Sequence, residues 1–188
     1  MIPTMKSYLG TCALLALAAC GSPQNSYYML SQTPPGGAVP GSNRTVAIDD
    51  VSIPGQLDKP QIVIGLDENR VDVHEYDRWA EPFDGMVRRT LGEDLRARLG
   101  AGRVLEKPNK DSLALSVTID TFGRQGDRVV LRGRWTLKEQ GKDGAVPPHS
   151  FDEDLALDPN APIPATVAGM SRLLGQVSDE MALSVEKR

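Results

Sequence analysis

Two segments of the chain repeat apolar residues every three or four positions, the spacing that places them on one face of an α-helix. The first runs from Pro82 to Leu99 and the second from Ala165 to Val185. Proline is tolerated in a first helical turn, and Gly100 is a typical end signal. Charged residues of the first segment, Arg98 among them, fall outside its apolar face. The apolar faces comprise Phe83, Met86, Val87, Leu91, Leu95 and Leu99, and then Val167, Met170, Leu174, Val177 and Met181.

Alternating apolar and polar residues predict β-strands in the rest of the chain. The two longest alternations are 113–120 and 129–138, and the sequence GRQGD between them indicates a turn. The apolar parity of 44–53 shifts near Asp49 and Asp50, which indicates a bulge there. Shorter strands are predicted at 27–30, 44–53, 61–66, 70–76 and 151–157, with 61–66 and 70–76 forming a hairpin.

The order of these elements, strands and a helix followed by strands and a helix, predicts a single α+β domain. We expect a mainly antiparallel sheet with the two amphipathic helices packed on one of its faces. The narrow apolar seam of the 165–185 helix is also compatible with a coiled coil. Few positions contribute to that seam, so packing on the sheet is favoured.

Composition narrows the possible functions. The chain has 188 residues, 40% of them hydrophobic, and its 21 Lys and Arg against 25 Asp and Glu give a net charge of -4. An acidic chain argues against nucleic-acid binding, because a surface that follows phosphates is usually basic. Two cysteines and two histidines leave little material for a Cys/His metal site.

The N-terminal segment predicts export from the cytoplasm. Lys6 precedes an apolar run from Leu9 to Ala19, which is too short to span a hydrocarbon core about 30 Å thick and is typical of a signal peptide. The run ends in Leu-Ala-Ala-Cys, which resembles the bacterial lipobox. That resemblance implies cleavage before Cys20 and acyl chains on Cys20. The alternative is an ordinary secretory signal with an incidental cysteine.

These patterns divide the chain into a lipoprotein signal peptide (1–19), a lipidated tether (20–26) and a domain (27–188). Cys20 would be the only cysteine of the mature chain, so no intrachain disulfide is expected. Position 21 is Gly instead of Asp, and in the sorting pattern of enterobacteria this favours the outer membrane over the inner one.

The sequence contains few candidate catalytic residues or metal ligands. His74 and Glu75 are neighbours on a strand, so their side chains point to opposite faces and do not converge on a metal. His149 and Ser150 have no identifiable acid partner for a triad. The sequence therefore predicts no catalytic residue, no cofactor-binding residue and no metal ligand.

A row of basic residues lies on one face of the 129–138 strand and the residue before it. Acidic residues on the two predicted neighbouring strands could pair with this row, and we favour that arrangement over binding of anionic lipid headgroups. The basic residues are Arg128, Arg132, Arg134 and Lys138, and the acidic ones are Asp120, Asp152 and Asp154.

Several motifs, in order along the chain, carry a resemblance to a known family. They are the lipobox, Tyr27-Tyr28-x-Leu30, VSIP at 51–54, LDKPQIV at 57–63, RWAEPF at 78–83 and GRW at 133–135. Together they resemble the PqiC family, also called the YmbA family, of ABC-type transport auxiliary lipoproteins. The resemblance implies a lipoprotein of a Gram-negative outer membrane that faces the periplasm. It also implies work with a periplasmic MCE-domain protein and an inner-membrane transporter component in lipid transport and membrane integrity, without catalysis or a cofactor.

The corner formed by Arg78, Trp79 and Pro82 is the candidate structural or interface element. Trp79 lies at a strand-to-helix junction, where an aromatic residue usually packs under the corner, and an exposed partner-binding role is the alternative. The tether of six residues, 21–26, reaches about 20 Å at roughly 3.3 Å per residue, which suits a docking module held close to its membrane.

Other functions stay open at the level of the residues. A periplasmic lipid-binding shuttle would need a large apolar cavity, and a hydrolase would need a nucleophile with a base beside it. Exposed strand edges also allow a homo-oligomer.

Overall fold

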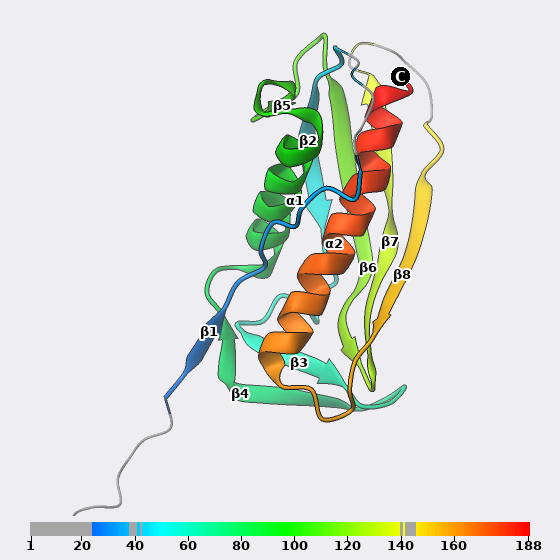
Figure 1. Ribbon diagram of the computed structural model, residues 1–188. Coiled ribbons are helices and arrows are strands. Elements are labelled where there is room, and N and C mark those ends of the chain that lie inside the picture. The colour runs from blue at the N-terminus through cyan, green and yellow to red at the C-terminus, as the bar shows by residue number, and fades with distance from the viewer. Residues whose placement is uncertain (1–23, 38–40, 42, 140, 142–145) are drawn as a thin grey trace, which may run out of the picture.

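The computed structural model describes residues 24–37, 41, 43–139, 141 and 146–188, and Figure 1 shows their arrangement. The elements are β1 (Ser26–Tyr28), β2 (Val46–Ser52), β3 (Gln61–Gly65), β4 (Val71–Trp79), α1 (Phe83–Leu99), a 3-10 turn η1 (Ala101–Arg103), β5 (Val104–Leu105), β6 (Leu113–Gln125), β7 (Arg128–Glu139), β8 (His149–Ala156) and α2 (Ile163–Glu186).

The strands form one sheet whose longest ladders are antiparallel. β6, β7 and β8 follow one another as antiparallel neighbours, and β3 and β4 form the expected hairpin. β2 lies parallel to β6, and its register shifts between Ile48 and Asp50, which confirms the predicted bulge. β1 adds to the end of β4 in parallel, with Ser26 opposite Asp77. The α+β class with a mainly antiparallel sheet is therefore confirmed, whereas the short strand β5 was not anticipated.

Both helices cover the same face of the sheet, as Figure 1 shows. The apolar positions that define the two helical repeats are all buried, and they pack with the inward-facing residues of β6 and β7 into one core. α2 packs against β6, β7, β8 and α1, so packing on the sheet is confirmed over an isolated coiled coil. The core leaves the outer face of β6, β7 and β8 to solvent.

The segment after β1 crosses both helices instead of continuing as a strand. β1 ends at Tyr28, two residues before the predicted end, and the backbone N–H of Leu30 then contacts Met86 Sδ of α1. Further along, the N–H of Ser31 donates to Ser171 Oγ of α2. We call residues 30–37 the strap, because this segment joins α1 to α2 on the side away from the sheet (Figure 1).

The burial of one charged side chain of α1 is not predicted by the sequence pattern. Arg98 was placed outside the apolar face of the helix, but its side chain is fully buried, as is that of Asp94 one turn before it. The reason is that α1 is covered twice, by the sheet on one side and by the strap with α2 on another. A face that sequence periodicity assigns to solvent therefore becomes an interior contact.

Candidate functional site

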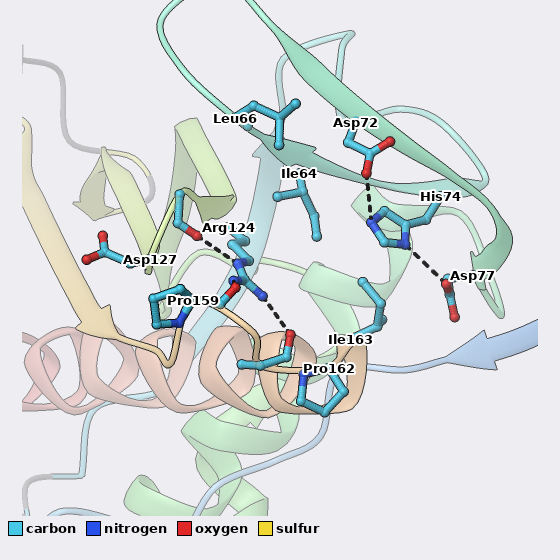
Figure 2. A pocket seen from close by; sticks show the side chains of 13 residues that line it. Ile64, Leu66, Asp72, His74, Asp77, Arg124, Asp127, Pro159, Pro162 and Ile163 are labelled. Atoms are coloured by element: carbon cyan, nitrogen blue, oxygen red, sulfur yellow. Dashed lines mark hydrogen bonds and ion pairs between the residues drawn. The ribbon is translucent and has the colours of Figure 1, made fainter.

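One end of the molecule brings together segments that are distant in sequence. The hairpin of β3 and β4, strand β1, the turn between β6 and β7, and the start of α2 all meet there (Figures 1 and 2). We call β1 with the β3–β4 hairpin the tether end, because the chain enters the domain through β1. A surface groove of about 610 Å³ lies on the side that faces α2. Its lining includes Ile64, Leu66, His74, Arg124 and Ile163.

Arg124 closes the floor of this groove. Its guanidinium donates to the backbone carbonyls of Gly126 at 2.8 Å, Ala161 at 2.7 Å and Pro159 at 2.6 Å. The residue is almost fully buried, and Figure 2 shows its side chain reaching from β6 to the loop before α2. A guanidinium engaged by carbonyls in this way holds a loop in place, which makes Arg124 a structural clamp instead of an anion-binding group.

His74 lies between two carboxylates on the opposite wall of the groove. Its Nε2 is 3.4 Å from Asp72 Oδ2 and its Nδ1 is 3.2 Å from Asp77 Oδ2 (Figure 2). Tyr28 of β1 donates its hydroxyl proton to Asp77 Oδ1 at 2.8 Å, and desolvation together with that hydrogen bond raises the pKa of Tyr28. The hydrogen bond between Tyr28 and Asp77 therefore connects β1 to β4.

This arrangement does not gather metal ligands. Glu75, the neighbour of His74, does not join the cluster, in line with the alternation of side chains along a strand. Within the described ranges, no group of three or more His, Cys, Asp or Glu side chains has the geometry to hold a metal ion.

A second groove, of about 380 Å³, lies on the other face of the hairpin. Val63, Val71 and Val73 line it from β3 and β4, and Phe122 lines it from β6. Charged side chains of both signs border this apolar strip: Lys59, Arg70, Asp67 and Glu68. The hairpin therefore presents an apolar face to solvent with no excess of either charge around it.

The corner predicted from sequence lies where β4 turns into α1. Trp79 is 8% exposed, and its ring lies 4.9 Å from that of Phe83, so it packs in the core at the base of the corner. Pro82 directly precedes α1 in extended conformation. Arg78 Nε is buried and has no hydrogen-bond partner in the part of the chain that the structure describes. An open groove of about 310 Å³ borders the corner, lined by Lys59, Trp79 and Phe83 among others.

The basic row on β7 has the partners that the sequence indicated. Arg128 pairs with Asp154, Arg132 with Asp152 at 2.7 Å, and Arg134 with Asp120 at 3.3 Å. All six side chains are solvent-exposed and bridge neighbouring strands on the outer face of the sheet. We call these three ion pairs the outer ladder. Its pairing confirms the cross-strand prediction, and the competing headgroup site loses its three arginines to carboxylates.

Besides the contacts of His74 with Asp72 and Asp77, sequence reasoning missed two polar groupings. One is the Arg124 clamp, whose only sequence signal is an arginine inside a turn rich in glycine. The other is a buried network in which Arg98 contacts Asp94 at 3.1 Å and Asp179 at 2.6 Å, while Asp94 accepts the N–H of Thr33 at 2.9 Å. The spacing of Asp94 and Arg98 by four residues in a helix was the available signal.

The predicted lipid attachment residue, Cys20, lies outside the described residues. Among the described helices, none combines the length and the apolar character needed to cross a membrane. The tether end and its grooves are thus the features that the structure places beside the first residues of the domain.

Both a family model and individual relatives relate this chain to transport lipoproteins. A family model for the ABC-type transport auxiliary lipoprotein component matches residues 28–182. The intermembrane transport lipoproteins PqiC of Escherichia coli (strain K12) and of Shigella flexneri are each 31% identical to this chain over 144 residues, 73% of this chain and 77% of theirs.

Two solved structures resemble the fold. A crystal structure of an uncharacterised protein has a TM-score of 0.72 and 25% identity, with 87% of this chain and 99% of that chain aligned. A crystal structure of a Xanthomonas campestris protein has a TM-score of 0.66 and 17% identity, with 86% and 97% aligned. The second likeness concerns the fold alone.

Proposed function

Because this chain belongs to the family of ABC-type transport auxiliary lipoproteins, we propose that it is the outer-membrane-anchored docking subunit of an intermembrane lipid transport system. The observation that carries the proposal is the match of the family model to nearly the whole domain. In this proposal acyl chains on Cys20 hold the domain at the periplasmic face of the membrane. The domain then binds a periplasmic MCE-domain protein, which connects it to an inner-membrane component.

The arrangement of charged side chains supports a binding role over catalysis. Arg124 is engaged by carbonyls, Arg98 is buried against Asp94 and Asp179, and the arginines of the outer ladder are paired. These groups stabilise the fold or cover its surface, so the domain acts by shape and surface complementarity. We propose no chemical step and no cofactor for it.

The packing of the domain interior can be compared with what a periplasmic lipid-binding shuttle, the alternative function, would require. A shuttle must enclose an acyl chain, and lipid-sized sites are apolar cavities that bury most of the ligand. Here the space between sheet and helices is filled by the core side chains, and the two grooves of the tether end are open to solvent. The geometry therefore favours a docking role.

Co-purification tests the docking function. The full-length chain with a C-terminal tag is expressed in its host, extracted with detergent and purified, and the bound proteins are identified by mass spectrometry. We expect an MCE-domain protein to be recovered at near-stoichiometric amounts. A chain that is recovered as a monomer with bound phospholipid and without an MCE-domain protein contradicts the docking function and supports the shuttle.

Substitution of Cys20 tests the anchor separately. Cys20→Ala is expected to abolish lipidation and to leave the chain at the inner membrane with its signal peptide uncleaved. Density-gradient separation of the two membranes and intact-mass measurement report location and lipidation. The anchor is wrong if the variant matures and fractionates as the wild type does.

A further inference from the structure

The exposed large apolar side chains gather at one end of the molecule. Seven such side chains are exposed in the described part of the chain, and six belong to the tether end or to the residues next to it. The exception is Leu183, near the other end of α2 (Figure 1). The six are Tyr27, Met29, Leu66, Val71, Val73 and Tyr76. An apolar cluster of this kind on a folded domain marks a contact surface.

The same end carries an open strand edge. β4 pairs with β3 along one side, but on its other side only Asp77–Trp79 are paired, with β1. Residues 71–76 of β4 have no strand neighbour on that side among the described residues. Proteins usually protect such an edge, because unpaired N–H and C=O groups recruit other chains. Here the edge combines free backbone groups with the exposed Val71, Val73 and Tyr76.

The distance between Cys20 and the open edge of β4 indicates which partner can cover that edge. The argument rests on the proposed attachment of acyl chains to Cys20. Ser26 follows Cys20 by six residue steps, a span of at most about 20 Å. Val71 lies six residues along β4 from Asp77, the partner of Ser26, which is again about 20 Å at 3.3 Å per residue. The whole open edge is therefore within reach of the membrane that holds the anchor.

We infer that the tether end rests on the surface of that membrane, with Val71, Val73 and Tyr76 in the lipid headgroup layer. Tyrosine suits this layer because its ring is apolar and its hydroxyl stays hydrated. The unpaired backbone groups of β4 limit the depth, since they would lose their hydrogen bonds to water in the hydrocarbon core. The contact is thus shallow and is made mainly by apolar side chains.

Charge plays a minor part in this contact. At the hairpin tip Arg70 Nε pairs with Asp67 Oδ2 at 2.6 Å, and Lys59 and Glu68 border the same groove. Both signs are present at the tip, and the open edge adds the exposed carboxylates of Asp72 and Glu75, so anionic headgroups gain no net attraction from this surface. The contact should therefore persist at high salt, unlike binding through a basic patch.

Contact at the tether end fixes the orientation of the domain. The long strands β6 and β7 run away from the hairpin, and the C-terminus of α2 lies at the far end (Figure 1). With the hairpin on the membrane, the far end of the molecule points into the periplasm. Attachment through acyl chains on Cys20 would not by itself select this orientation.

Site-specific fluorescence tests the contact on the lipidated full chain. In this protein Cys20 carries acyl chains, so a cysteine introduced by Val71→Cys or by Leu183→Cys is the only free thiol. Each variant is labelled with an environment-sensitive fluorophore and reconstituted in phosphatidylethanolamine–phosphatidylglycerol vesicles with a headgroup-attached quencher. Leu183→Cys is the matched control, because Leu183 is also an exposed apolar residue but lies at the other end. We expect quenching at position 71 to be several-fold stronger than at 183, at low and at high salt.

The outcomes separate this inference from the proposed function. If the unlabelled wild type does not float with the vesicles, the anchor itself is wrong. If it floats and the two labels are quenched equally, the membrane contact is wrong and the anchor stands. Weak quenching at 71 together with cross-linking of Val71→Cys to a second copy overturns the inference in favour of a homo-oligomer interface. Weak quenching at 71 that falls further when the MCE-domain protein is added overturns it in favour of a protein partner.

Discussion

Arginine–aspartate pairs occur in two regions of this molecule that differ in their access to water. In the network between α1, α2 and the strap, the side chains of Arg98 and Asp94 are both 0% exposed. In the outer ladder, those of Arg132 and Asp152 are 51% and 66% exposed. The two regions use the same functional groups at similar distances, so burial is the property that separates them.

The difference shows that an ion pair is not one kind of interaction. In the buried network, Arg98 also donates to the carbonyl oxygen of Gly175 at 2.8 Å, and Asp94 accepts the N–H of Thr33, so the pair connects three segments of the fold. Water can replace none of these contacts. In the outer ladder each charge stays hydrated, and losing its partner returns it to solvent. Removing one partner should thus be costly in the first region and nearly neutral in the second.

The largest effect is expected for Arg98→Met. This change keeps much of the apolar volume but leaves Asp94 buried without its cation and removes the contacts of Arg98 with Gly175 and Asp179 of α2. We expect the free energy of unfolding to fall by about 3–5 kcal/mol. Urea denaturation followed through the fluorescence of the two tryptophans measures it. Arg96→Met, at an exposed position of the same helix, is the control and should change stability by less than about 0.5 kcal/mol. Equal effects of the two variants would contradict the comparison.

A steric change should disturb the network without touching a charge. A Cβ on Gly175 of α2 would overlap Thr33 Oγ1 and lie 3.3 Å from Arg98 Nη2. Gly175→Ala is therefore expected to displace the strap and to lower the free energy of unfolding by about 1–3 kcal/mol. Gly85→Ala is the control, because a Cβ there meets nothing within 4 Å and alanine favours the helix. If Gly175→Ala is as stable as the wild type, the strap is not fixed by this packing.

The buried network should also respond to pH. Burial raises the pKa of Asp94, although the Thr33 N–H and Arg98 act in the opposite direction. The folded chain then holds a proton on Asp94 at a pH where the unfolded chain has released it. The resulting stability is complete below the unfolded pKa of about 4 and is lost as the pH rises through the higher folded pKa.

Comparison with Asp94→Asn isolates this effect, because the amide does not titrate. The wild type should gain stability relative to this variant as the pH is lowered from about 7 towards about 4. Urea denaturation of both chains across this range measures the difference. A difference that stays constant or shrinks towards acidic pH would show that Arg98 outweighs burial in setting the pKa of Asp94.

The same two regions show what could be predicted from sequence. The outer ladder was predictable because strand alternation fixes which residues share a face, and the partner strands were already recognisable. The burial of Arg98 was not, because it depends on the strap, whose path is set by contacts such as that of Ser31 with Ser171, 140 residues away in sequence. The role of Arg124 was not predictable for a similar reason, since its carbonyl partners Pro159 and Ala161 lie in the loop before α2, more than 30 residues away in sequence. Periodicity predicts elements and their apolar faces, whereas long-range packing decides which polar groups become interior.

The smallest effect is expected in the outer ladder, and a double-mutant cycle on Arg132 and Asp152 measures it. The coupling energy from Arg132→Ala, Asp152→Ala and the double variant should be about 0.2–1 kcal/mol, typical of exposed pairs. It should shrink further at about 1 M salt, where the screening length falls to about 3 Å. The Arg134–Asp120 pair, also exposed and at the longer distance of 3.3 Å, should couple no more strongly. A coupling near 3 kcal/mol would place the ladder beside the Arg98 network and remove burial as the explanation of their difference.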